Sequence, residues 1–99
     1  MSFTKNVEIL GSPGVARQCT AGAASAYTQL GPNVYRISMR AVGADVRYEI
    51  ALTAATASAT TSHFIADGER LDLAVASASY LSYIRDASTD GVLEVTELV

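Results

Sequence analysis

Polar residues near the end of the chain have the types and spacing of a calcium-binding loop. Positions 1, 3, 5 and 12 of an EF-hand loop supply oxygen ligands, and here they are Asp86, Ser88, Asp90 and Glu97. Gly91 occupies position 6, where the EF-hand turns sharply. If this match is functional, the segment binds calcium.

The residues on either side of this loop favour a different structure. An EF-hand needs a helix before and after the loop, but only two residues follow Glu97. Residues 80–84 precede it and are mainly aromatic, β-branched or polar, which is typical of a strand. We therefore predict two strands that pair through a turn at Asp90-Gly91, and keep the calcium loop as the alternative.

The side chains that could support catalysis are few. Cys19 is the only cysteine, which excludes an internal disulfide, and we interpret it as a small buried residue on a strand. His63 is the only histidine, which excludes a multi-histidine metal site, and we expect it at the edge of a strand or loop. No nucleophile-elbow pattern accompanies them. We predict a protein without enzymatic activity or cofactor.

Alternating apolar and polar residues predict a central β-hairpin. Gly43-Ala44 fits a two-residue type II′ turn, which takes glycine at its first position. Counting outward from this turn places four apolar pairs on one face: Ala41 with Val46, Met39 with Tyr48, Ile37 with Ile50, and Tyr35 with Leu52. We expect this face to form the core, with polar residues on the other.

The polar face of this hairpin carries three arginines. Arg36, Arg40 and Arg47 share it, and the register sets Arg40 directly opposite Arg47. Like charges in that position destabilise a strand pair unless an anion relieves them, and Glu49 lies diagonal to Arg40. Two interpretations stay open: a solvated face with one compensating pair, or a surface that docks on an acidic protein.

Further segments complete the predicted sheets. Residues 71–75 alternate after a turn signal at Asp67-Gly68, residues 93–96 alternate near the end, and residues 15–20 are a candidate strand. We interpret residues 54–61 as a loop, although a short helix there is an alternative. Residues 11–14 break the chain after an apolar segment, 1–10, whose apolar members are Phe3, Val7, Ile9 and Leu10. This segment is either an extended arm that reaches a neighbouring subunit or a first strand folded on its own domain.

Length and charge limit the class of protein. The 99 residues form one domain, 1–99, large enough to bury roughly two-thirds of its unfolded surface. The net charge of −3 disfavours nucleic acid as a partner. Neither a signal peptide nor an apolar run of membrane-spanning length is present, so we expect a soluble protein made in the cytoplasm. The fold predicted is a compact antiparallel β-sandwich of seven or eight short strands, and the pattern allows a jelly roll.

The second half of the chain resembles small virion proteins of tailed bacteriophages. Three segments carry the resemblance: an alanine- and threonine-rich linker at 53–60, a strand pair around 63–69, and the ending 84–98. Together with the residues between and around them, they extend the resemblance over residues 34–99. It implies a small β-sandwich that resembles capsid decoration, or cement, proteins, which bridge major capsid protein subunits in many copies without catalysis. For the isolated protein we expect a homotrimer.

Two other functions stay open from the sequence. One is a tail, neck or fibre component of the virion. The other is a small carbohydrate- or calcium-binding module, in which tyrosines would form a sugar platform. The five tyrosines are Tyr27, Tyr35, Tyr48, Tyr80 and Tyr83.

Overall fold

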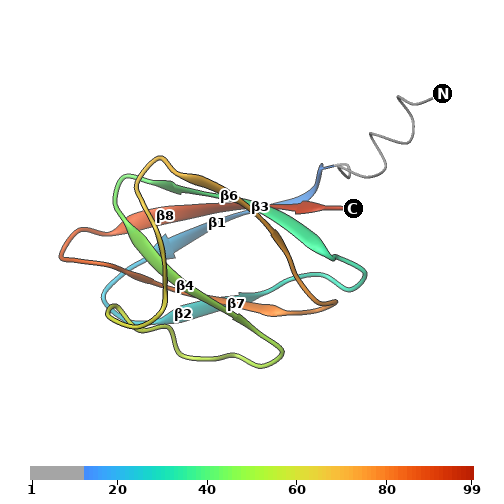
Figure 1. Cartoon of the computed structure of the whole chain (residues 1–99), viewed down its shortest axis with the longest axis horizontal. Helices are drawn as coiled ribbons and strands as arrows, with labels where there is room; N and C mark the ends of the chain where they lie inside the picture. The colour runs from blue at the N-terminus through green and yellow to red at the C-terminus, as the bar shows by residue number, and fades with distance from the viewer. Residues whose placement is uncertain (1–12) are drawn as a thin grey trace.

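A computed structural model describes residues 13–99, which form eight strands in two packed antiparallel sheets (Figure 1). The spatial order in the first sheet is β1 (Pro13–Ala21), β8 (Gly91–Leu98), β3 (Arg36–Val42) and β6 (Arg70–Ala74). In the second sheet it is β2 (Ala26–Gln29), β7 (Tyr80–Arg85), β4 (Val46–Ala51) and β5 (His63–Ile65). The predicted all-β antiparallel sandwich is confirmed.

Consecutive strands lie in opposite sheets, with the exception of β4 and β5. Four connections, 22–25, 43–45, 66–69 and 86–90, carry the chain from one sheet to the other at the same end of the sandwich, here called the crossing end. The opposite, terminal end carries the remaining loops together with the start of β1 and the end of β8. Two four-stranded sheets connected in this order form a jelly roll, also called a double-stranded β-helix.

The predicted central hairpin is wrong. β3 pairs with β6 and β8, whereas β4 pairs with β5 and β7, so the predicted Ala41–Val46 pair and the three beyond it do not form. The turn itself is present, with Gly43 at φ 91°, but it bends the chain between sheets. The strands on either side of Asp67-Gly68 and of Asp90-Gly91 are likewise separated between sheets instead of pairing.

The meaning of alternation explains why the predicted strand pairing is wrong and why most of the predicted burial is right. Alternation records which face of a strand is buried and does not identify the neighbouring strand. The predicted inward residues of β3 and β4 are indeed buried: Ile37, Met39, Ala41, Val46 and Tyr48, with Ile50 partly so. Tyr35 and Leu52 are 57% and 72% exposed because they lie beyond the strand ends, so their assignment to the core was wrong.

Most remaining elements follow the sequence prediction. Strands occur over the expected segments 15–20, 80–84 and 93–96 and over 71–75 except its last residue, and residues 54–61 form a loop without a helix. The strand β2 was not predicted, because its residues are largely exposed and show no apolar alternation. The predicted arm or first strand, with Phe3, Val7, Ile9 and Leu10, lies outside the described residues.

An ion pair with a buried carboxylate and a partly buried guanidinium lies toward the terminal end of the sandwich. Glu97 points inward from β8 and is 2% exposed. Its Oε2 accepts hydrogen bonds from Arg17 Nη2 of β1 at 2.8 Å and from the Gly31 backbone N–H at 2.9 Å. A Cβ at position 31 would lie 3.3 Å from Glu97 Oε1, so glycine allows the loop to approach the carboxylate. These contacts tie β1, β8 and the loop after β2 together.

Cys19 occupies the position expected of it. It points inward from β1, is 5% exposed, and forms a hydrogen bond with Tyr83 of β7. Burial raises the pKa of the Cys19 thiol, and burial together with the neighbouring thiol raises the pKa of Tyr83 to about 12. The contact therefore joins the two sheets through uncharged groups.

We predict that the ion pair of Glu97 makes stability depend on pH. Burial alone would raise the pKa of Glu97, but the hydrogen bonds from Arg17 and Gly31, with the charge of Arg17, outweigh it and lower this pKa below 4.5. A lowered folded-state pKa contributes stability above the unfolded-state value, which is lost as pH falls through the folded-state value. Glu97→Gln should cost about 1–3 kcal/mol at pH 7.

Urea denaturation of both proteins at pH 7 and at pH 3 measures this contribution. The difference between wild type and Glu97→Gln should shrink at the lower pH, because protonation of this carboxylate in the unfolded state then favours unfolding of the wild type. A difference that stays constant between the two pH values would contradict the role assigned to this carboxylate.

Candidate interaction surfaces

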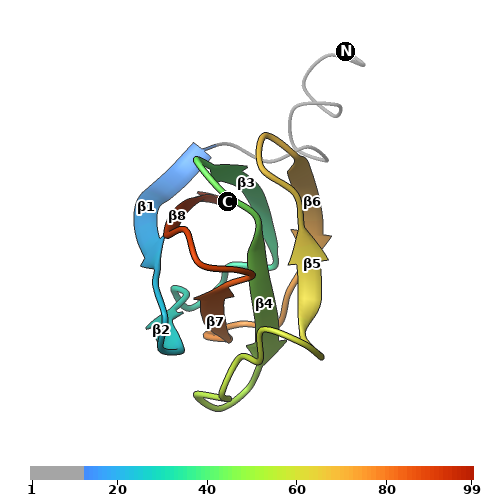
Figure 2. The same ribbon diagram turned by 90° about the vertical axis from the view of Figure 1, so that its left-hand side faces the viewer.

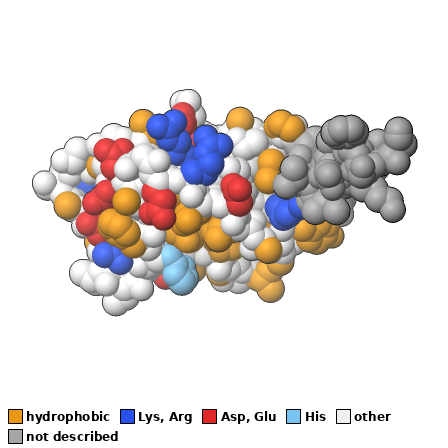
Figure 3. All heavy atoms as spheres, turned by 45° about the horizontal axis from the view of Figure 1, so that its top comes forward, with side chains coloured by type: hydrophobic (Ala, Val, Ile, Leu, Met, Phe, Trp, Pro, Cys, Tyr) orange, Lys and Arg blue, Asp and Glu red, His pale blue; other side chains and the backbone are white. Residues whose placement is uncertain are grey.

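The outer face of the first sheet carries two of the predicted interface arginines. Arg36 and Arg40 both point outward from β3. Arg40 is directly opposite Arg70 of β6 on one side and Glu94 of β8 on the other. Figure 3 shows basic side chains gathered beside acidic ones on this part of the surface. The predicted basic surface therefore exists on β3, but the arginine opposite Arg40 comes from β6 and not from β4.

Arg40 and Arg70 form an unusual pair. They occupy directly opposed positions of an antiparallel ladder, where like charges repel. Within residues 13–99 neither guanidinium lies within 4.0 Å of a carboxylate oxygen, even though Glu94 is the neighbour of Arg40 on β8. The hydroxyls of Ser38 and Thr96 border the same shallow hollow of about 80 Å³. Glu94 also lines this hollow, so Arg40 and Arg70 share it with a carboxylate that does not form an ion pair with either of them.

Arg47 does not belong to this surface. It lies on the outer face of the second sheet, so the prediction that it opposes Arg40 is wrong, as is the diagonal pairing of Arg40 with Glu49. Its Nε donates to Asp86 Oδ1 at 2.7 Å and its Nη1 to the Ser62 carbonyl at 3.0 Å. The guanidinium also lies 4.8 Å from the centre of the Phe64 ring. Arg47 thus anchors two loops within its own domain.

The four candidate calcium ligands do not converge. Asp86 bonds to Arg47, Asp90 bonds to Arg85 at 2.7 Å, and Glu97 bonds to Arg17. Residues 91–98 form the extended strand β8, which places Glu97 roughly 23 Å from Asp90 along the strand. An EF-hand loop requires these oxygens around one ion at 2.3–2.6 Å. In the described part of the chain, no three His, Cys, Asp or Glu side chains gather in a metal-binding arrangement.

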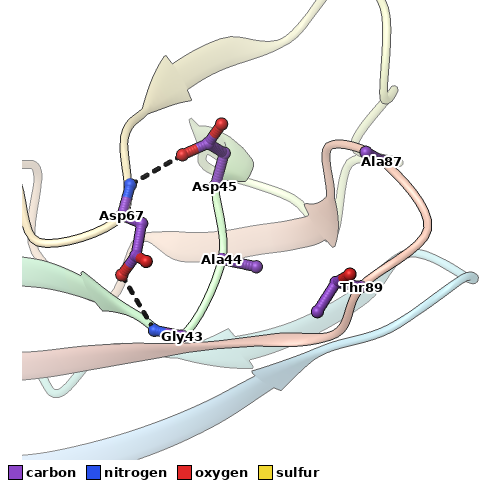
Figure 4. A pocket seen from close by; sticks show the side chains of 6 residues that line it. All are labelled: Gly43, Ala44, Asp45, Asp67, Ala87 and Thr89. Carbon is purple, nitrogen blue, oxygen red and sulfur yellow. Dashed lines mark hydrogen bonds between the residues drawn. The ribbon is translucent and has the colours of Figure 1, made fainter.

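The crossing end contains an open hollow of about 330 Å³ beside two aspartates (Figure 4). Asp67 Oδ1 accepts from the Gly43 N–H at 2.9 Å, and Asp45 Oδ1 accepts from the Asp67 N–H at 2.8 Å. Ala44, Ala87 and Thr89 complete the lining. Both carboxylates therefore cap the turns that cross between the sheets, which gives each of them a structural role.

The tyrosines separate into two groups. Tyr48 and Tyr83 face the core, whereas Tyr27 and Tyr80 form an edge-to-face pair on the outer face of the second sheet, with ring centres 5.7 Å apart. Tyr35 lies at the terminal end and is exposed. The five rings therefore do not form a continuous platform for a sugar.

One side of the sandwich leaves the core partly open. Figure 2 shows β5 and β6 on this side and β1 and β2 on the opposite side. The four hydrophobic residues that pack against the core but are only partly buried are Ile50, Leu71, Leu73 and Val75. They come from β4, from β6 and from the residue that follows β6. We call the space between β4 and β6 the lateral opening.

Two adjoining hollows form the lateral opening. One of about 230 Å³ lies against Tyr48, Ile50, His63, Leu73 and Ala74, and the other, of about 350 Å³, continues past Ile50 and Ala74 to Leu52 and Val75. His63 is the first residue of β5, as expected for a strand edge, and its ring centre lies 5.4 Å from that of Tyr48. Alternation in the sequence predicted that these aliphatic residues face inward. It did not predict that no described strand covers them between β4 and β6.

The shortness of β5 creates this opening. β5 pairs with β4 only over Val46–Tyr48, so the remaining half of β4 has no paired strand on that side within the described residues. Among the described strands β6 pairs only with β3, so its other edge is free along its whole length within residues 13–99. An apolar strip between two unpaired strand edges is the surface that an additional strand recognises.

Comparisons with known proteins identify the fold alone. No family model matches the chain, and no curated protein matches it in sequence. A de novo designed double-stranded β-helix, solved by solution NMR, is similar in structure, with a TM-score of 0.58 and 11% sequence identity. The match covers 85% of this chain and 99% of the designed one. It agrees with the jelly-roll order of the strands. The described residues contain no helix long and apolar enough to span a membrane.

The opposed arginines lead to a first prediction about these surfaces. Arg70→Glu replaces a repulsive cross-strand pair with an attractive one, so it should stabilise the isolated domain by a few tenths to about 1 kcal/mol at low salt. Thermal unfolding in low and high salt measures the gain, which salt should reduce. Arg70→Gln is the control, since it removes the repulsion only. A destabilised Arg70→Glu protein at low salt would show that Arg40 and Arg70 do not repel.

The dispersed acidic residues lead to a second prediction. Millimolar calcium should leave the melting temperature and the solution mass of the protein unchanged relative to chelator, because the three candidate carboxylates, Asp86, Asp90 and Glu97, are each bonded to a different arginine. Calorimetry and light scattering in both conditions check this. A stabilisation by calcium that Asp90→Asn abolishes would restore the calcium-loop interpretation.

Proposed function

We propose that this protein is a non-enzymatic structural component of a bacteriophage virion, and that it acts as a capsid decoration, or cement, protein. In this role it bridges neighbouring major capsid protein subunits through surface contacts, as a homotrimer. The proposal draws on the resemblance of residues 34–99 to small phage virion proteins, and on a jelly-roll architecture that viral capsid proteins also use. Because fold alone does not imply function, the surface must supply the argument.

The single observation that carries the proposal is the basic pair of Arg40 and Arg70. In a chain of net charge −3, two exposed arginines stand side by side on a sheet face without an ion-pair partner among the described residues. Their planar guanidinium groups can each bind a carboxylate in a bidentate manner. An acidic patch on a neighbouring virion subunit would relieve the repulsion that the isolated domain retains.

A decoration protein acts by burying surface against its neighbours and not by catalysing a reaction. The outer face of the first sheet offers charged and hydroxyl side chains around Arg40, which is the composition of an interface rim. The lateral opening offers the apolar strip that the core of an interface requires. The two surfaces are separate, so the protein can contact two different neighbours at once.

Deletion of the gene from a phage that encodes it tests the proposed role. Wild-type particles should contain many copies of the protein by mass spectrometry. Deletion particles should still assemble heads that release DNA at a lower temperature or under milder osmotic shock. A tail, neck or fibre role would instead place the protein in purified tails and leave head stability unchanged. Absence of the protein from gradient-purified particles would end the proposal.

The variant Arg70→Glu separates docking from folding in the same system. It should leave the domain folded and at least as stable, yet reduce its recovery on particles, and Arg70→Gln should have an intermediate effect. Full recovery of the charge-reversed protein would show that the basic pair does not contact the virion.

A further inference from the structure

We infer that the lateral opening is the acceptor site for residues 6–10 of a second copy of this chain, which add a strand to the free edge of β6. The inference deepens the homo-oligomeric part of the proposed function, on which it rests for its biological setting. The contact itself belongs to the isolated protein, and it is tested without a virion.

The first argument concerns the surface that awaits a partner. Ile50, Leu73 and Val75 contact the core but retain exposure, and all three border the lateral opening. Leu52 stands beside them with 72% of its surface exposed. On the opposite side of the sandwich, Arg17 hydrogen-bonds Glu97 and Thr28, which links β1, β8 and β2. The core is therefore completed on one side and left partly uncovered on the other.

The second argument concerns the backbone. β6 offers five residues, and β4 offers the three after Tyr48, with no ladder partner facing the opening among the described strands. A strand of about five residues, roughly 17 Å long, would satisfy the β6 edge along its length. Its inward side chains would then cover the three aliphatic residues. The ligand that fits is an extended peptide with alternating apolar residues.

The third argument identifies that peptide. Residues 1–12 lie outside the described range, and Asn6 to Leu10 among them reads polar, apolar, acidic, apolar, apolar. Val7 and Ile9 are two apart, so an extended backbone directs both to the same face. The segment therefore has the alternation that the lateral opening requires.

The fourth argument decides between the same copy and a second one. β1 begins at Pro13 on one edge of its sheet, whereas β6 is the opposite edge, so a strand added beyond β6 would be four strand spacings, or about 19 Å, from β1. Crossing that distance within one chain requires at least about six extended residues, 7–12, and so consumes Val7 and Ile9. A second copy can present Val7 and Ile9 to the opening together, because it is not bound by this geometry.

A contact of this kind is heterologous, since the donor and acceptor surfaces differ. Heterologous contacts form closed rings where the rotation between copies permits it. Three copies, each donating its segment to the next, would give the homotrimer expected for the protein. The same ring would leave the outer face with Arg40 and Arg70 free for a different partner.

Cysteine cross-linking in the full chain tests the inference. In a Cys19→Ala background, chains carrying Val7→Cys or Ile9→Cys are mixed with chains carrying Ala74→Cys, which lines both hollows. Under mild oxidation we expect covalent dimers of the two chains at micromolar concentration. The matched control is Thr20→Cys, an exposed position on β1 of the same sheet, which should react at least tenfold more slowly.

The double variant Val7→Cys/Ala74→Cys then reports the source of the strand. Products that extend to a covalent trimer support exchange between copies, whereas a cross-link confined within single chains would overturn it in favour of the same copy. Equal coupling to Ala74→Cys and Thr20→Cys would overturn the acceptor site altogether. Neither of these failures changes whether the protein is found on virions, so the proposed function stands or falls separately.

Discussion

The insertion of β8 between β1 and β3 is the constraint on which the rest of the structure depends. The strand pairs with both neighbours over most of its length, and its inward residues Leu93 and Val95 are buried at the centre of the sandwich. Its last inward residue, Glu97, joins β1 to the loop at Gly31. β1 and β3 do not pair with each other, so their relative position in the sheet depends on β8, which follows both in the sequence.

This dependence makes folding a long-range process. Among the strands of residues 13–99, only β4 and β5 are both consecutive in sequence and paired, and that ladder covers three residue pairs. Every other ladder brings together strands with at least one other strand between them in the sequence. Chains of this kind lose loop entropy before they gain most of their contacts, and they fold slowly compared with proteins built from hairpins. The turns capped by Asp45 and Asp67 therefore direct the chain between sheets and do not nucleate hairpins.

The sequence predicts more of the layers than of their connections. Alternation correctly assigned Ile37, Met39, Val46 and Leu93 to the interior, because a strand buries the same face whichever strand lies beside it. Pairing was missed because Gly43 and Gly68, both with positive φ, fit a turn within one sheet as well as a turn between two. The same error in pairing grouped the three predicted interface arginines on one face. In the structure Arg36 and Arg40 lie on one sheet and Arg47 on the other. The sequence analysis named Glu97 only as a candidate calcium ligand, and its contact with Arg17 inside the sandwich was not predicted.

The thiol of Cys19 gives the chain a property separate from its contacts. A buried thiol with a raised pKa is mostly unreactive at neutral pH, since the thiolate is the species that attacks electrophiles. Cys19 lies between the sheets on β1, so a reagent reaches it only when this edge of the sandwich separates. With one cysteine in the chain, the rate of alkylation counts such openings without any introduced label. The alkylation rate of Cys19 therefore measures how often the two sheets separate.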